Sequence, residues 1–93
     1  MSVRVKVPTQ LRDLVGGQTE LDVEATSIRE LLGKVGADHP ELVERVIGED
    51  GEIRRFINVY VEDEDVRFLE GLDTPLKDRQ TVSILPAVAG GAP

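Results

Sequence analysis

The segment with the clearest potential for chemistry is the C-terminal one, residues 87–93, which reads Ala87-Val88-Ala89-Gly90-Gly91-Ala92-Pro93. It carries no charge and no large side chain. Because nothing in it can pack in a core, we expect a flexible tail that protrudes from the folded part of the chain. A glycine pair lacks Cβ atoms and can pass through a channel too narrow for other residues. The tail therefore predicts a terminal carboxylate that is threaded into another protein's active site, although many chains also end in inert flexible glycines.

The side chains offer little other chemistry. The absence of cysteine excludes disulfides, thiolate metal sites and a cysteine nucleophile. The only histidine, His39, precedes Pro40 at an expected helix start, so we expect a surface or capping role instead of a metal site. The acidic run 62–65 lacks the spacing and the central glycine of a calcium loop, and we interpret it as a solvated turn. We therefore expect no bound metal and no catalytic side chain.

Length and composition indicate one small globular domain. The chain has 93 residues, of which 40% are hydrophobic and 31% charged. Its net charge of −7 repels phosphate groups, so neither nucleic acid nor an anionic membrane is an expected partner. No apolar run approaches the roughly 20 residues that span a bilayer, and the first residues do not resemble a signal peptide. We expect a cytoplasmic protein with a folded domain over residues 1–86 and the tail over residues 87–93.

Hydrophobic periodicity in the N-terminal half predicts a strand pair followed by helices. Valines alternate with basic residues over 3–7, and apolar residues alternate with acidic ones over 20–24. Both segments are expected to be half-buried strands, joined by a long, loose connection. The segment 27–30 matches a capping box at a helix start, and apolar residues follow at helical spacing as far as an expected stop at Gly36. A second short helix is expected to begin at Pro40.

The C-terminal half predicts further strands. The segment with the strongest strand pattern, 53–61, and the segment 81–85 are expected to be strands, with a short strand at 66–69 between them. Pro86 closes the last strand. This order of elements predicts an α+β domain in which one main helix packs across one face of a mixed sheet.

Two stretches carry a resemblance to a known family. Residues 58–68 (NVYVEDEDVRF) and 81–91 (TVSILPAVAGG) resemble the ubiquitin-like sulfur-carrier family (MoaD/ThiS/CysO), with the greatest likeness to actinobacterial CysO-type carriers. The likeness extends from Val3 to Gly91. Its most specific part is the ending, in which a strand, a proline and small residues precede Gly-Gly. The resemblance implies a ubiquitin-like β-grasp fold and the role of a protein cosubstrate, not an enzyme.

The resemblance also implies the chemistry of the tail. In that family an ATP-dependent enzyme related to ubiquitin activators adenylates the terminal glycine, which is then converted to a thiocarboxylate that donates sulfur. By position, Gly91 is implied to carry the adenylate and the thiocarboxylate, while the preceding tail residues occupy the partner's channel: Ala87, Val88, Ala89 and Gly90. The composition agrees, since without cysteine any carried sulfur must sit on the terminal carboxyl carbon. The chain lacks the glycine-rich phosphate-binding motifs, so we expect the partner to bind ATP and this chain to bind no cofactor.

The sequence departs from the family pattern in two places. Ala92 and Pro93 follow Gly91, so Gly91 is in a peptide bond as encoded and cannot be activated. The resemblance to carriers with such extensions implies a zinc-dependent JAMM-type peptidase that removes both residues. A permanent extension and an inert tail are the alternative. Many family members also have glycine in the turn before the last strand, where this chain has the segment 78–80, Asp-Arg-Gln, so the turn geometry can differ.

The last strand predicts a docking surface beside the tail. If Val82 and Ile84 point inward, Leu85 points outward and places apolar surface where an activating enzyme must grip. Phe56 or Tyr60 on a neighbouring strand can extend this surface, although alternation alone does not tell which face they take. For Phe56, packing in the core is the favoured expectation.

The sequence leaves three roles open. The first is a sulfur carrier that supplies a sulfur-accepting synthase in the formation of cysteine or of another sulfur-containing metabolite. The second is a ubiquitin-like modifier that becomes joined through Gly91 to lysines of target proteins. The third is a non-catalytic subunit that only inserts its tail into a partner and never reacts.

Overall fold

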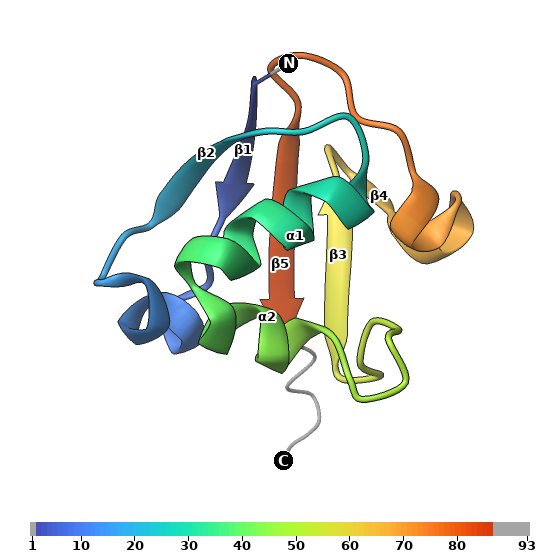
Figure 1. Cartoon of the computed structure of the whole chain (residues 1–93). Helices are drawn as coiled ribbons and strands as arrows, with labels where there is room; N and C mark the ends of the chain where they lie inside the picture. The colour runs from blue at the N-terminus through green and yellow to red at the C-terminus, as the bar shows by residue number, and fades with distance from the viewer. Residues whose placement is uncertain (1, 87–93) are drawn as a thin grey trace.

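The computed structural model describes residues 2–86 of the chain. Its helices and strands are, in chain order, β1 (Ser2–Lys6), η1 (Thr9–Val15), β2 (Glu20–Glu24), α1 (Ile28–Asp38), α2 (Pro40–Val46), β3 (Ile57–Val61), β4 (Glu64–Asp65), η2 (Val66–Phe68), η3 (Gly71–Asp73) and β5 (Thr81–Pro86), where η marks a 3₁₀ helix. The strands form one sheet in the order β2-β1-β5-β3-β4, and α1 and α2 lie across one of its faces (Figure 1). In this part of the chain no helix is long and apolar enough to cross a membrane.

The last strand occupies the centre of the sheet. β5 pairs in parallel with β1 and antiparallel with β3, while β2 and β4 form the two edges. The side chains that face the helices are almost fully buried, and Val5, Val82 and Ile84 are at most 1% exposed. The sheet with α1 across one face is the β-grasp arrangement, so the predicted α+β fold with one main helix is confirmed.

The connection between the first two strands is more ordered than the sequence suggests. Residues Thr9–Val15 form the 3₁₀ helix η1 and do not form a loose loop. Leu11 and Val15 close the lower end of the core, with exposed fractions of 6% and 1%. Gly16 then ends the helix in a left-handed conformation, with φ of 69°. Burial of these two side chains stabilises this 3₁₀ helix, whose hydrogen-bond geometry is poorer than that of an α-helix.

The capping box predicted for α1 is present, but the predicted stop is wrong. The Ser27 hydroxyl accepts a hydrogen bond from the Glu30 backbone N–H at 3.1 Å, as a helix N-cap does. The helix runs past Gly36 to Asp38. A Cβ atom at Gly36 would lie 3.3 Å from Val43 Cγ2. Gly36 therefore allows α2 to pack closely against α1, and it does not end the helix.

Two strand boundaries in the C-terminal half differ from the prediction. β3 begins at Ile57, because residues 54–57 form a turn closed by a hydrogen bond from Ile57 N to Arg54 O at 3.0 Å. The short partner strand is Glu64–Asp65, and the segment predicted as a strand, 66–69, begins with the 3₁₀ helix η2. The strand assignment failed because apolar residues in this segment are spaced as in a strand while the chain turns around the edge of the sheet.

The turn that leads into β5 keeps a glycine-like conformation without a glycine. Arg79 has φ of 69°, in the left-handed region that side chains disfavour. The turn is fastened to the start of β1, since Arg79 N donates to Ser2 O at 2.6 Å and Ser2 N donates to Asp78 Oδ1 at 2.9 Å. These bonds hold Arg79 in the strained conformation and set the register in which β5 enters the sheet.

Candidate functional site

The residues predicted to react lie outside the part of the chain that the structure describes. They are the acceptor of the adenylate, Gly91, the channel residues Ala87, Val88, Ala89 and Gly90, and the extension Ala92 and Pro93. What the structure describes is the surface from which this segment continues. β5 delivers the chain to Pro86, which pairs with Ile57 at the beginning of β3.

The alternation predicted for β5 is confirmed. Val82 and Ile84 are buried against the helices, while Leu85 lies on the opposite face of the sheet with 47% of its surface exposed. In the register of the sheet, Leu85 lies opposite Asn58 on β3. Leu85 therefore places exposed apolar surface at the tail exit, which is the end of β5 from which residues 87–93 continue.

The expectation that Phe56 packs in the core is wrong. It lies in the turn before β3 and has 72% of its surface exposed. Phe56 is out of phase with the buried residues Ile57, Val59 and Val61, and the turn places it before the strand begins. Its position directly before the residue that pairs with Pro86 places it beside the tail exit.

Tyr60 lies on the same face of the sheet as Leu85 but farther from the tail. It alternates with the buried residues of β3, pairs with Ser83 on one side and Asp65 on the other, and is half-buried. Ser83, which lies between Tyr60 on β3 and Lys6 on β1, has a small side chain. Tyr60 and Leu85 therefore share one face of the sheet, while Phe56 lies in the turn before β3.

Two further apolar residues, Phe68 and Leu69, are exposed although the sequence did not predict it, with 86% and 39% of their surfaces exposed. The strand assignment for this segment hid them. The chain has one tyrosine and two phenylalanines, and none of them belongs to the buried core, whose apolar side chains are all aliphatic. Aromatic side chains are enriched at the energetically important positions of interfaces. The sequence signal that could have identified them is the scarcity of aromatic residues, 3% of the chain, beside many aliphatic residues that can fill the core.

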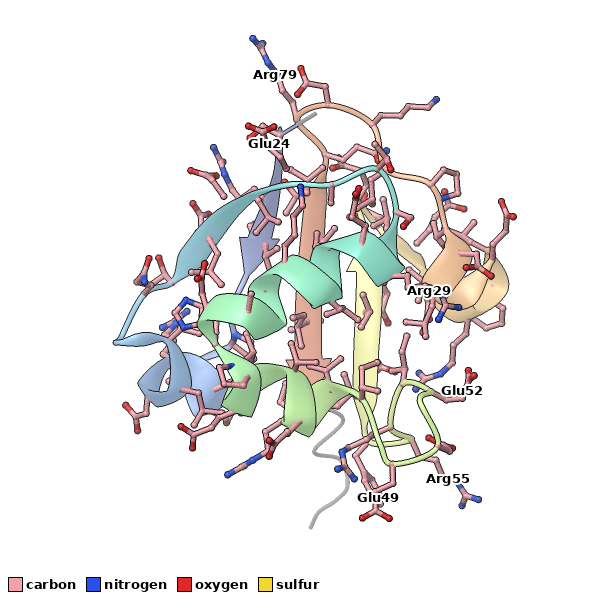
Figure 2. The ribbon with its side chains drawn as sticks, viewed as in Figure 1. Glu24, Arg29, Glu49, Glu52, Arg55 and Arg79 are labelled. Atoms are coloured by element: carbon pink, nitrogen blue, oxygen red, sulfur yellow. The ribbon has the colours of Figure 1, made fainter. Side chains whose placement is uncertain are left out.

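The two ends of the sheet differ in what surrounds them. Figure 2 shows Arg55 beside the end at which β5 finishes and Arg79 at the end at which β5 begins. Arg54 and Arg55 both precede Phe56 in the chain, and Arg54 Nε donates to Glu44 O at 2.9 Å. Basic and apolar groups thus lie next to each other near the tail exit, although the chain as a whole is acidic.

Titratable groups do not gather into a reactive site within residues 2–86. No group of three or more histidine, cysteine or acidic residues in this part lies close enough to hold a metal ion. His39 is the N-cap residue of α2 and its side chain makes no capping hydrogen bond. The pKa of Glu30 is lowered from its ordinary value of 4.5, because the Thr26 backbone N–H and hydroxyl donate to its carboxylate. This carboxylate stabilises the start of α1 and has no chemical role.

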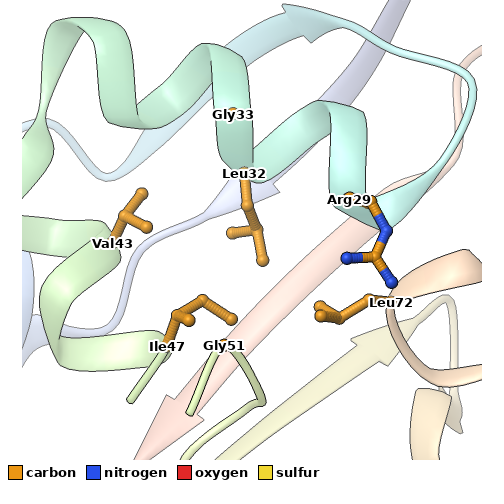
Figure 3. A pocket seen from close by; sticks show the side chains of 7 residues that line it. All are labelled: Arg29, Leu32, Gly33, Val43, Ile47, Gly51 and Leu72. Carbon is orange, nitrogen blue, oxygen red and sulfur yellow. The ribbon is translucent and has the colours of Figure 1, made fainter. Parts of the chain in front are cut away.

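A pocket of about 190 Å³ lies on the helix side of the sheet, away from Leu85. Figure 3 shows its apolar side chains pointing into one space, with Arg29 at the rim. The lining residues are Arg29, Leu32, Gly33, Val43, Ile47, Gly51 and Leu72. None of the residues predicted for the site lines this pocket, and Arg29 is paired with Asp73 at 3.1 Å. This pocket is therefore separate from the residues predicted for the site.

Comparison with known proteins agrees with this fold and this ending. The family model described as "ThiS family" matches residues 5–91. The sulfur carrier protein CysO of Mycobacterium tuberculosis is 41% identical over 93 residues, which covers 98% of this chain and all of that protein. A chain in the crystal structure of the Amycolatopsis orientalis BexX/CysO complex has a TM-score of 0.89 and 44% identity, and covers 96% of this chain and 99% of that one. The small archaeal modifier protein 3 of Haloferax volcanii is 33% identical over 98% of this chain and its own full length.

A β-grasp domain whose central strand leads into a Gly-Gly segment defines the class of ubiquitin-like carrier proteins. The chain belongs to the ThiS family, as its match over residues 5–91 shows. It is a sulfur carrier protein of the CysO/ThiS type. Sulfur carrier proteins are cosubstrates and not enzymes, which agrees with the expectation that the chemistry is performed by partners.

Proposed function

We propose that this protein carries sulfur as a thiocarboxylate on Gly91, after removal of Ala92 and Pro93. The observation that supports this most is the extent of the family match, which ends at Gly91 and leaves both following residues outside it. A processed chain ends in a free glycine carboxylate. Without processing, Gly91 is followed by Ala92, and its carbonyl is part of an amide bond that ATP cannot activate in this way.

The proposed reaction needs two partner-catalysed steps. In the first, an oxygen of the Gly91 carboxylate attacks the α-phosphorus of ATP, forming the acyl-adenylate and releasing pyrophosphate. In the second, a sulfide-level sulfur nucleophile attacks the carbonyl carbon, and AMP leaves with the electron pair of the broken C–O bond. A carboxylate is a poor electrophile, so the adenylate supplies the leaving group that the exchange of oxygen for sulfur requires. The described residues contribute docking and leave these steps to an enzyme related to ubiquitin activators.

We propose that Leu85, Phe56 and Tyr60 form the surface to which this activating enzyme binds. The exposure of Leu85 and Phe56 on either side of the Ile57–Pro86 pair supports this assignment. A rigid apolar surface at the base of the tail fixes the distance from the docking contact to Gly91. The tail residues from Ala87 to Gly90 then occupy a channel that excludes larger side chains.

The sulfur acceptor is proposed to be a synthase that makes cysteine or another sulfur-containing metabolite. The complex of an Amycolatopsis orientalis CysO with BexX supports the idea that a carrier of this type docks stably with a second protein. A JAMM-type zinc peptidase is proposed to remove Ala92 and Pro93 before activation.

The intact mass of the protein purified from its native host tests this proposal. The expected species lacks Ala92 and Pro93 and has one carboxyl oxygen replaced by sulfur. If only the full-length mass is found, the purified chain is treated with a JAMM-type peptidase, an activating enzyme, ATP and sulfide. A trimmed chain that releases no pyrophosphate under these conditions contradicts the carrier mechanism.

The likeness to the small archaeal modifier protein 3 favours a second candidate, conjugation of Gly91 to target lysines. Both functions begin with adenylation and differ in the nucleophile, which is a sulfur atom in one and a lysine amine in the other. Immunoblots of host extracts against this chain distinguish them. A ladder of higher-mass species that resists thiols, with the segment 80–91 attached to target lysines after tryptic digestion, supports the modifier function.

A further inference from the structure

Arg67 makes contacts that neither the core nor the tail chemistry explains. It lies in η2, directly after the edge strand β4, and keeps 38% of its side chain exposed. Its guanidinium group donates to three acceptors: Nη1 to Asn58 Oδ1 at 2.9 Å, and Nη2 to Arg54 O at 2.8 Å and to Ile57 O at 2.7 Å. A lysine ammonium group could not match this forked arrangement, because it is a single point of charge.

All three acceptors belong to the segment 54–58, which contains the exposed Phe56. Arg54 O also accepts from Ile57 N at 3.0 Å and so closes the turn in which Phe56 is the third residue. Nη2 of Arg67 therefore bonds the first and the last carbonyl of the same turn. Hydrogen bonds from a charged donor are stronger than neutral ones, so the guanidinium group holds this turn in one conformation.

Arg67 is itself fixed in place by Asp65. The Asp65 carboxylate accepts from the Arg67 backbone N–H at 2.8 Å through Oδ1, and its Oδ2 lies 4.0 Å from Nη1. The Asp65 side chain is only 13% exposed, so water screens this pair less than a surface ion pair. The direction of the guanidinium fork is set by η2 and does not depend on a partner.

The segment 54–58, which the hydrogen bonds of Arg67 clamp in place, lies next to the last described residues of β5. Ile57 pairs with Pro86, and Asn58 pairs with Leu85. One acceptor of Arg67 thus lies directly opposite Leu85, and another lies directly opposite the residue after which the tail begins. The same guanidinium group fixes both the turn that carries Phe56 and the strand positions beside the tail exit.

We infer that Arg67 is a positioning residue for partner docking, which holds the segment 54–58 so that Phe56 and Leu85 form one pre-arranged apolar surface. This inference rests on the proposed function, since it assumes that an activating enzyme docks at the tail exit. A surface that is ordered before binding loses less conformational entropy on association. Loss of the clamp therefore weakens recognition of the carrier and leaves the chemical step at Gly91 unchanged.

Steady-state adenylation tests the inference. A chain ending at Gly91 is titrated into an activating enzyme that accepts it, and pyrophosphate release is measured. Arg67→Gln is expected to raise KM for the carrier about tenfold with kcat unchanged. Arg67→Lys is expected to remain impaired, and Arg29→Gln, which breaks the Arg29–Asp73 ion pair on the helix side, keeps the wild-type KM. A wild-type KM in Arg67→Gln, or complete rescue by lysine, overturns the inference.

A double-mutant cycle tests whether Arg67 acts through Phe56. Phe56→Ala alone is expected to raise KM, and adding Arg67→Gln to it is expected to raise KM by much less than Arg67→Gln does in the wild-type chain. Equal effects in both backgrounds show that Arg67 acts independently of the ring, and they overturn the inference. If Arg67→Gln does not fold, Arg67→Lys carries the same cycle, since it keeps the alkyl chain and the charge.

Amide hydrogen exchange tests the clamp without a partner. In Arg67→Gln, the Ile57 amide is expected to exchange at least about fivefold faster, because the turn that it closes opens more often. The Val7 amide, which donates to Thr19 O at 2.9 Å in the other half of the sheet, is expected to keep its rate. Unchanged exchange at Ile57 overturns the inference. A wild-type chain that no activating enzyme adenylates contradicts the proposed function instead, and the exchange result is independent of it.

Discussion

On the face of the sheet that the helices cover, Val5, Val82 and Ile84 are at most 1% exposed, whereas on the opposite face the adjacent Leu85 remains 47% exposed. The first face is built from aliphatic side chains that pack against α1 and α2. The second face presents Tyr60 together with small and charged side chains such as Ser83 and Lys6. One strand, β5, therefore contributes alternate residues to the core and to the surface at the tail exit.

This difference separates stability from recognition along a single strand. Substitutions on the covered face change the free energy of unfolding because they remove packed methyl groups. Substitutions on the open face leave the packing intact and change only what a partner contacts. The two faces should therefore respond independently to mutation: substitutions on the covered face should change stability, and substitutions on the open face should change docking.

The largest effect is expected on the covered face. Leu31 lies near the start of α1 and is 0% exposed, so Leu31→Ala removes buried methyl groups and leaves a cavity. We expect a loss of about 2–5 kcal/mol in the free energy of unfolding, measured by chemical denaturation. Leu31→Met, which conserves volume, is the control and should cost less than about 1.5 kcal/mol. A loss in Leu31→Ala as small as the one expected for Leu31→Met would mean that this face is not tightly packed.

A smaller, purely functional effect is expected on the open face. Leu85→Asp places a charge at the base of the tail, and we expect KM for adenylation of the trimmed carrier to rise about tenfold or more. The free energy of unfolding should change by less than about 0.5 kcal/mol, because the side chain is half exposed. Leu69→Asp is a matched control, since Leu69 is 39% exposed and adjoins Gln80 near the start of β5. Unchanged kinetics in Leu85→Asp would remove Leu85 from the docking surface.

Much of the covered face could be predicted from the sequence, because it is encoded in local periodicity. The alternation around Val82 and the capping box at Ser27 both predicted elements that the structure contains. The predictions failed where tertiary packing overrides local pattern. Gly36 stops no helix because Val43 packs against it, and Val66 begins a 3₁₀ helix because the chain turns at the sheet edge.

The open face could be predicted only in part. Alternation alone placed Leu85 outward, because Val82 and Ile84 were expected to point inward, and both are buried. It could not place Phe56, because Phe56 and Ile57 are adjacent apolar residues, either of which could have pointed into the core, and the chain turns before Ile57. The contacts of Arg67 with residues 54–58 span sequence separations of 9 to 13 residues. Local periodicity could not predict them, because it reports only on residues within one element.

A substitution in the turn that leads into β5 should change the free energy of unfolding without altering either face of the sheet. Arg79 has φ of 69°, a conformation that costs a side-chain-bearing residue energy and glycine almost none. We expect Arg79→Gly to raise the free energy of unfolding by about 0.5–1 kcal/mol, because relief of strain exceeds the added freedom of the unfolded chain. Thermal melts measure this, with Arg79→Ala as a control that keeps the strain. A decrease in Arg79→Gly would show that the side chain itself stabilises the turn.

The smallest effect is expected at the start of α1, where Glu30 links the stability of the covered face to pH. Its pKa is below the ordinary 4.5, because the Thr26 backbone N–H donates to the carboxylate at 2.7 Å and the Thr26 hydroxyl at 3.0 Å. A depressed pKa in the folded state means that this stabilisation is present above 4.5 and is lost as pH falls through the lower, folded value. The melting temperatures of wild type and Glu30→Ala should therefore converge as pH falls from about 7 to about 3. Glu30→Gln keeps an acceptor at this position, so its difference from Glu30→Ala should stay constant over the same range. A wild-type advantage over Glu30→Ala that does not shrink in acid would mean that packing of the side chain, and not its charge, stabilises the helix start.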